Sequence, residues 1–194
     1  MLHADTAQKY FVRPDGSVNH IIEFNPETGE FVRAYGGQGY TEGSSWPRGQ
    51  GWGVYGFMIS YIHTGKQEYF DTAKRIAHYI MANIPDSGII PVDFRQPKEP
   101  AWEDSCAACV IANGLIEIAK HVPELEKDMY IRAAVKILKA IDKTRANWGT
   151  DCDSIVLNCT GAYHSPDHHF TMVYADFYFI EAVLKLRGND YFMW

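Results

Sequence analysis

The order of apolar and polar positions along the chain predicts a mostly helical protein. Residues 2 to 11 have a short helical period, which ends before the turn signal Pro14-Asp15-Gly16. Two strand-like runs follow, His20-Ile21-Ile22-Glu23-Phe24 and Glu30-Phe31-Val32-Arg33, on either side of Asn25-Pro26-Glu27-Thr28-Gly29. We expect these two runs to form a small β-hairpin within the first long loop.

Five further helices are predicted, and they are of two kinds. Residues 49 to 62 and 106 to 118 are apolar around the whole circumference, which is typical of a helix buried on all sides. Residues 67 to 84 and 125 to 146 instead carry their apolar side chains on one face. A last apolar helix is predicted at about residues 171 to 186. The alternation predicts two layers, with buried helices inside and amphipathic helices outside.

Loop lengths predict where functional residues gather. Short loops connect each buried helix to the amphipathic helix that follows it. The long segments 13 to 48, 85 to 103 and 148 to 170 connect amphipathic helices to the next buried helix. These three segments then share the end of the molecule at which the buried helices begin, and the helix N-termini favour an anionic ligand there. The helices are about half of those needed for a closed ring. We therefore expect an all-α fold, a partial α/α toroid, in one domain over residues 1 to 194.

Composition and charge exclude several classes of partner. The 194 residues include 18 Lys and Arg against 24 Asp and Glu, which gives a formal net charge of -6. No basic run could neutralise several phosphates in a row, so we expect no nucleic-acid partner and no binding to an anionic membrane. The sequence shows no signal peptide, which predicts a cytoplasmic protein. Aromatic residues make up 14% of the chain and suit a site for a ring-shaped ligand.

Several motifs resemble one enzyme family, in the same order along essentially the whole chain. The most specific covers residues 36 to 57, GGQGYTEGSSWPRGQGWGVYGF. The others are Val12-Arg13-Pro14-Asp15-Gly16-Ser17 with His20, Asn25-Pro26-Glu27-Thr28-Gly29, Asp104-Ser105-Cys106-Ala107-Ala108 and residues 174 to 182. Together they resemble the unsaturated glucuronyl hydrolases, a family of bacterial glycoside hydrolases, and specifically its C-terminal half.

The resemblance implies a six-fold α/α toroid of the six-hairpin glycosidase type. Members of the family remove a 4,5-unsaturated uronic acid from the oligosaccharides that polysaccharide lyases produce. An aspartic acid protonates the vinyl ether at C4 and directs water to C5, and the resulting hemiketal opens by itself. No metal or organic cofactor takes part. The family's two catalytic aspartates precede the matched segment, so we assign no catalytic residue and expect this chain alone to be inactive.

Four residues match the family's sugar-contacting positions: His20, Gln38, Arg48 and Trp52. The guanidinium of Arg48 suits a uronate or a hydroxyl, and the indole of Trp52, one turn later, suits stacking on a sugar ring. His20 and Gln38 can each donate and accept hydrogen bonds. The alternatives are an ion pair for Arg48, core packing for Trp52, a half-buried structural role for His20, and a turn-shaping role for Gln38.

Other reactive side chains have simpler explanations. A zinc site can be imagined from a set of cysteines and histidines: Cys106, Cys109, Cys152, Cys159, His164, His168 and His169. Cysteines among helical alanines are more often small core residues, so we expect no metal. The paired acids Glu103 and Asp104 favour a helix cap over an acid/base pair. The loop from 163 to 169 is rich in His and has no Lys, which leaves sulfate recognition open.

Two other functions remain open at this stage. The chain could be a non-catalytic carbohydrate-binding relic, or one chain of a split enzyme whose other half is a separate polypeptide. Half a ring exposes surface of the inner helices, and large apolar patches drive association. We therefore expect a homo-oligomer, or a complex with the missing N-terminal half, that binds an unsaturated uronic acid oligosaccharide.

Overall fold

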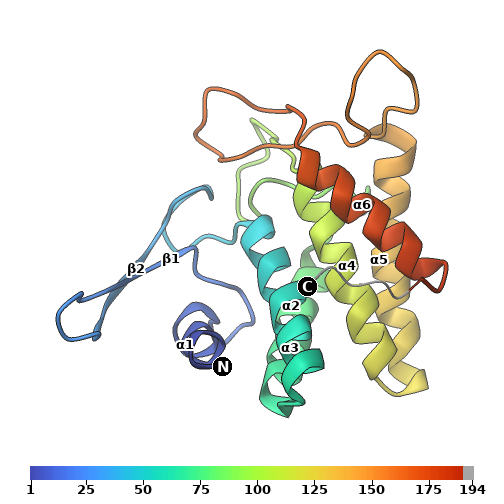
Figure 1. The fold of residues 1–194 in the computed structure, drawn as a ribbon. Helices are drawn as coiled ribbons and strands as arrows, with labels where there is room; N and C mark the ends of the chain where they lie inside the picture. Colours follow the sequence, from blue (N-terminus) through green and yellow to red (C-terminus); the bar gives the residue numbers. More distant parts are fainter. Residues whose placement is uncertain (190–194) are drawn as a thin grey trace.

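The computed structural model describes residues 1 to 189, which form six helices and one antiparallel hairpin (Figure 1). In chain order the elements are α1 (Leu2–Phe11), β1 (Ile21–Phe24), β2 (Phe31–Tyr35), α2 (Pro47–Thr64), α3 (Gln67–Asn83), α4 (Ser105–His121), α5 (Glu124–Thr144) and α6 (Val173–Leu186). The predicted mostly helical fold with a small hairpin is confirmed, with boundaries that differ by a few residues. None of the described helices is long and apolar enough to cross a membrane.

Local sequence explains where the two central helices begin and end. Pro47 begins α2, at a position where a backbone N–H would have no helical partner. Gly65 ends α2 in the left-handed conformation, with φ 69°, and its N–H donates to the carbonyl of Tyr61. The carboxylate of Asp104 accepts from the N–H of Cys106 and caps α4. The predicted capping role of Asp104 is therefore confirmed.

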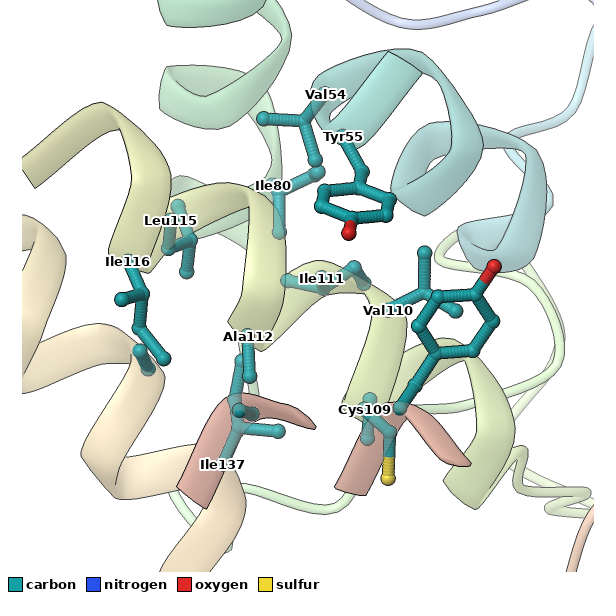
Figure 2. Packing of buried hydrophobic residues seen from close by; sticks show 14 of the residues in the cluster. Val54, Tyr55, Ile80, Cys109, Val110, Ile111, Ala112, Leu115, Ile116 and Ile137 are labelled. Carbon is teal, nitrogen blue, oxygen red and sulfur yellow. The ribbon is translucent and has the colours of Figure 1, made fainter. Parts of the chain in front are cut away.

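Helix α4 lies at the centre of the fold. It packs between α2 and α6 and against α5, while α3 packs against α2. Every residue of α4 from Ser105 to Ala119 is buried. Figure 2 shows how side chains of the neighbouring helices surround α4, among them Val54 and Tyr55 of α2, Ile80 of α3 and Ile137 of α5. The prediction of a buried helix with amphipathic neighbours is confirmed for α4, α3 and α5.

Helices α2 and α6 are less buried than their apolar sequences predicted. In α2, the indole of Trp52 is 37% exposed, and Gly56 is also exposed. In α6, Val173, Ile180 and Leu184 are exposed. The two helices flank α4. The expectation that residues 49 to 62 form a helix buried on all sides is wrong, since Trp52 and Gly56 are exposed, whereas the exposed side chains of α6 agree with the inner-helix surface expected of half a ring.

The second and third long segments lie together at one end of the helices, as predicted, whereas the first reaches that end only with its last part, after the hairpin (Figure 1). The N–H of Tyr163, in the third segment, donates to the carbonyl of Gln38 in the first at 2.8 Å. The N–H of Phe94, in the second segment, donates to the carbonyl of Ser45 in the first at 3.0 Å. These main-chain hydrogen bonds join the segments that carry the candidate site.

The hairpin projects to one side of the helices, next to α1 (Figure 1). Ile21 pairs with Tyr35, and a register shift follows Glu23. Antiparallel pairing places the start of β1 beside the end of β2. The residues that flank the hairpin, His20 and Gln38, are therefore brought close together.

Candidate functional site

His20 and Gln38 contact each other at the base of the hairpin. The backbone N–H of Gln38 donates to Nδ1 of His20 at 3.2 Å. The side-chain amide of Gln38 donates to the carbonyl of Gly161 at 2.6 Å. Gln38 therefore connects the hairpin to the third long segment, in addition to its contact with the imidazole.

The hydrogen bond from Gln38 sets the tautomer of His20. Because Nδ1 accepts the hydrogen bond from Gln38, the proton of the neutral ring is on Nε2. Burial is the main cause that lowers the pKa of His20. The ring also packs edge-on against Trp46, with a centroid distance of 4.5 Å. His20 is thus held as a neutral imidazole whose Nε2–H can donate to a ligand.

Arg48 is sealed in a buried ion pair. Its side chain donates from Nε and Nη2 to the two carboxylate oxygens of Asp104, each at 2.8 Å. Nη2 also donates to the carbonyl of Thr160 at 2.7 Å, and Nη1 donates to the hydroxyl of Tyr174 at 2.9 Å.

The side chain of Arg48 is almost completely shielded from solvent. The residue is 3% exposed. Burial alone would lower the pKa of the guanidinium, but Asp104 raises it above its ordinary value, so the group stays charged. This is the ion-pair arrangement weighed as the alternative from the sequence. A direct contact between Arg48 and a uronate is not supported by this geometry, because every guanidinium nitrogen already has a protein partner.

Trp52 is the most open of the four candidate residues. Its ring lies 6.4 Å from that of Tyr174 and 5.4 Å from that of Tyr178. It also lines an open groove between α1 and α2, about 420 Å³ in volume, together with His20 and Trp46. We call this the α1–α2 groove. Three of the four predicted residues are thereby brought together, since Gln38 contacts His20, and His20 and Trp52 share the groove.

Asp93 organises the loop that carries Gln38, and sequence reasoning missed it. Its carboxylate is fully buried. It accepts from the N–H of Tyr40 at 3.0 Å, the N–H of Ser45 at 3.1 Å and the hydroxyl of Ser44 at 2.6 Å. These partners lie 48 to 53 residues earlier in the chain. Two of them are main-chain groups, so no local motif marks Asp93 as a structural centre.

The two adjacent acids at the start of α4 do not form an acid/base pair. Asp104 binds Arg48, and Glu103 accepts from Nη2 of Arg145 at 2.8 Å and from Asn158. Burial would raise the pKa of Glu103, but the hydrogen bonds from Arg145 and Asn158 bring it below its ordinary value. Both carboxylates are therefore occupied by structural cations.

The cysteines are arranged as core residues. Cys106, Cys109 and Cys159 are buried, whereas Cys152 is exposed. Burial raises the pKa of all three buried thiols, which disfavours the thiolate form that binds metals. Within the described part of the chain, no group of three or more His, Cys, Asp or Glu side chains is arranged to hold a metal ion.

The chain is similar in sequence and structure to known hydrolases of unsaturated glucuronyl and chondroitin saccharides. The unsaturated glucuronyl hydrolase of Bacillus sp. strain GL1 is 36% identical over 193 residues, which cover 95% of this chain and 50% of that protein. The unsaturated chondroitin disaccharide hydrolase of Streptococcus pneumoniae is 29% identical over 98% of this chain and 51% of its own length. The crystal structure of the Bacillus sp. GL1 hydrolase matches with a TM-score of 0.87 and 34% identity, over 95% of this chain and 51% of that one. No family model matches the sequence.

The chain is thus similar in both sequence and fold to helical glycoside hydrolases. The family that both comparisons identify is that of the unsaturated glucuronyl hydrolases, which confirms the resemblance seen in the motifs. The chain spans about half the length of the curated relatives it matches.

Proposed function

We propose that this chain forms the C-terminal half of an unsaturated glucuronyl hydrolase and supplies part of its substrate-binding site. The observation that carries the proposal is the 36% identity to the Bacillus hydrolase over 95% of the chain. The α1–α2 groove, which His20 and Trp52 both line, supports it independently. The fold is then half of a six-fold α/α toroid, and its long-loop end is half of the active-site end.

The proposed substrate is an oligosaccharide that ends in a 4,5-unsaturated uronic acid. The exposed ring of Trp52 stacks on a sugar ring, since flat apolar faces favour this contact. The Nε2–H of His20 donates to a sugar hydroxyl, and the amide oxygen of Gln38 accepts from one. Arg48 does not grip the sugar in this arrangement, because its guanidinium binds Asp104.

The proposed reaction is hydration of the vinyl ether. A proton adds to C4, the oxygen of water adds to C5, and the resulting hemiketal opens and releases the remaining sugar. The buried carboxylates of Asp93 and Asp104 are both bound to protein donors, so neither offers an acid for this step. We infer that the acid comes from the part of the relatives that this chain does not match. General acid catalysis contributes roughly 10²- to 10⁴-fold, so the chain alone has negligible activity.

The proposed partner is the other half of the toroid, as a separate chain, or a second copy of this one. The outer flank of α6 exposes large apolar side chains, among them Val173, Ile180 and Leu184. Covering such side chains removes apolar area from water and favours association. Light scattering checks this part of the proposal, and a monodisperse monomer would contradict the homo-oligomer.

The test of function separates binding from catalysis. The purified chain is titrated with an unsaturated disaccharide from a lyase digest in a calorimeter, with the saturated disaccharide as the control ligand. The same mixture is followed by the absorbance of the vinyl ether. We expect binding without turnover, and turnover once the first half of the Bacillus sp. GL1 hydrolase is added as a separate chain. Absence of binding would refute the proposal. Turnover by the chain alone would refute the inference that the catalytic acid lies outside this chain. Binding without restored turnover would favour a non-catalytic carbohydrate-binding protein.

A further inference from the structure

Tyr174 is the place where the buried Arg48 network reaches the surface. Arg48, Asp104 and Thr160 are 3% exposed or less, whereas Tyr174 is 38% exposed. The hydroxyl of Tyr174 lies 2.9 Å from Nη1 of Arg48. A ligand that approaches the network from solvent therefore reaches the side chain of Tyr174 before the guanidinium.

The direction of that hydrogen bond fixes what the hydroxyl can offer. Arg48 has only donors, so the oxygen of Tyr174 must accept from it. The hydroxyl proton is then free to point away from Arg48 and donate. Burial raises the pKa of Tyr174 although Arg48 opposes this, so the hydroxyl keeps its proton at neutral pH. The positive charge behind the oxygen strengthens a hydrogen bond that it donates to an anion.

The surroundings of Tyr174 suit a sugar acid. The exposed ring of Trp52, 6.4 Å away, offers a face for the pyranose. Tyr174 lies in the first turn of α6, where the helix dipole favours negative charge and no side chain caps the N-terminus. The acid of this turn, Asp176, is engaged elsewhere, since it accepts from the N–H groups of Ile155 and Val156.

We propose that Tyr174 is a specificity-determining residue of the substrate site, whose hydroxyl, held by Arg48, donates a hydrogen bond to the carboxylate of the unsaturated uronic acid. The proposal rests on the function proposed above and adds a residue to it. It also gives Arg48 a role that its burial allows, since the guanidinium recognises the carboxylate through Tyr174 instead of by contact.

Tyr174→Phe tests the proposal, because it removes the hydroxyl and keeps the ring beside Trp52. Affinity is measured by calorimetry for an unsaturated glucuronyl disaccharide and for the same disaccharide with its carboxyl group reduced to an alcohol. A hydrogen bond to a charged group predicts roughly a tenfold or greater loss of affinity for the acid, and little change for the reduced ligand. The control is Tyr61→Phe, in the last turns of α2, whose ring stacks on Phe70 far from the network. It should bind both ligands as wild type does.

The outcomes separate this inference from the function on which it rests. If wild-type protein binds neither disaccharide, the proposed function fails and the role of Tyr174 fails with it. If wild type binds the acid and Tyr174→Phe binds it equally well, the inference is overturned while the function stands. An equal loss for both ligands also overturns the inference, since it assigns Tyr174 a purely structural role. Near-UV circular dichroism shows whether the variant keeps the packing of its aromatic side chains.

Discussion

Gly37 leaves the space that the imidazole of His20 occupies. A Cβ atom at Gly37 would lie 2.1 Å from Nδ1 and 2.3 Å from Cε1 of His20. The neighbouring residue, Gln38, donates its backbone N–H to the same Nδ1. The absence of a side chain at Gly37 is thus a condition for the contact that sets the tautomer of His20.

Gly37→Ala should therefore displace His20 and break its hydrogen bond with Gln38. We expect the affinity for an unsaturated disaccharide to fall several-fold, and stability to fall by about 1–3 kcal/mol as the loop adapts to the added methyl group. Calorimetry and urea unfolding measure the two effects. Gly56→Ala is the stability control, because no atom lies within 4 Å of its added Cβ and alanine favours a helix. Unchanged affinity with His20 in place would contradict the prediction.

Breaking the ion pair between Arg48 and Asp104 should be costly. Asp104→Asn leaves the guanidinium buried without its counter-charge, and we expect a loss of about 3–5 kcal/mol in the free energy of unfolding. Replacing both partners, as Arg48→Met with Asp104→Asn, should cost less than the sum of the single changes, because no uncompensated charge remains. Urea unfolding of the four proteins in this cycle checks both statements.

The matched control for that cycle is an exposed ion pair. Arg132 and Asp128 lie one turn apart on α5, at 2.9 Å, with side chains 80% and 73% exposed. Asp128→Asn should change stability by less than about 1 kcal/mol. If Asp104→Asn were as mild as Asp128→Asn, the buried pair would have no special place in the fold.

The periodicity of apolar residues predicted the helices well, because the apolar positions of a helix reflect which of its faces pack against neighbours. The unbroken apolar run of α4 follows from its neighbours on all sides, and the cap at Asp104 follows from a local rule. The same logic does not tell how far α6 is covered. An apolar surface shows that a helix is suited to burial, but it does not show whether the covering element lies in the same chain. Val173 and Ile180 are apolar and exposed for this reason.

The site was harder to predict than the fold because its side chains are defined by distant partners. The motif around Arg48 drew attention to this residue, but its position alone did not reveal Asp104, 56 residues later, as its partner. Asp93 escaped notice because three of its hydrogen-bond donors are backbone N–H groups, which any residue type supplies. The family resemblance singled out His20 and Gln38, and the hairpin brings them into contact.

The pKa of His20 makes a prediction about pH. Burial lowers this pKa below its value of about 6.5 in the unfolded chain. As pH falls, the unfolded chain therefore takes up the proton first. The stability linked to the neutral ring is present above about pH 6.5 and is lost as pH falls through the folded-state pKa.

NMR titration of the His20 ring should give a midpoint below 6.5, the ordinary value for histidine. In urea unfolding, His20→Gln should reduce the loss of stability between neutral and mildly acidic pH relative to wild type. His3→Gln is the control, because His3 is an exposed histidine on α1. A His20 midpoint at or above the ordinary value would show that the ring is more open to water than its packing against Trp46 indicates.

Asp93 should hold the first long segment in the shape that presents Gln38. One carboxylate oxygen accepts from the N–H of Tyr40 and the hydroxyl of Ser44, and the other accepts from the N–H of Ser45. The asparagine side chain in Asp93→Asn has nearly the same shape as the aspartate. Its NH₂ group, however, must replace one carboxylate oxygen and then faces hydrogen-bond donors instead of accepting from them. Hydrogen bonds to charged groups contribute about 1.5–3 kcal/mol each, so we expect a loss of about 2–4 kcal/mol.

That loss should be concentrated in the loop around Asp93. The exchange rates of the Tyr40 and Ser45 amides should rise at least as much as the loss in the free energy of unfolding implies. The affinity for the unsaturated disaccharide should also fall, because Gln38 lies on the same loop. Asp86→Asn, at an exposed position after α3, is the control and should change neither quantity. If the two amides kept their wild-type exchange rates in Asp93→Asn, the loop would owe its shape to its other contacts, such as the hydrogen bond between Gln38 and Tyr163.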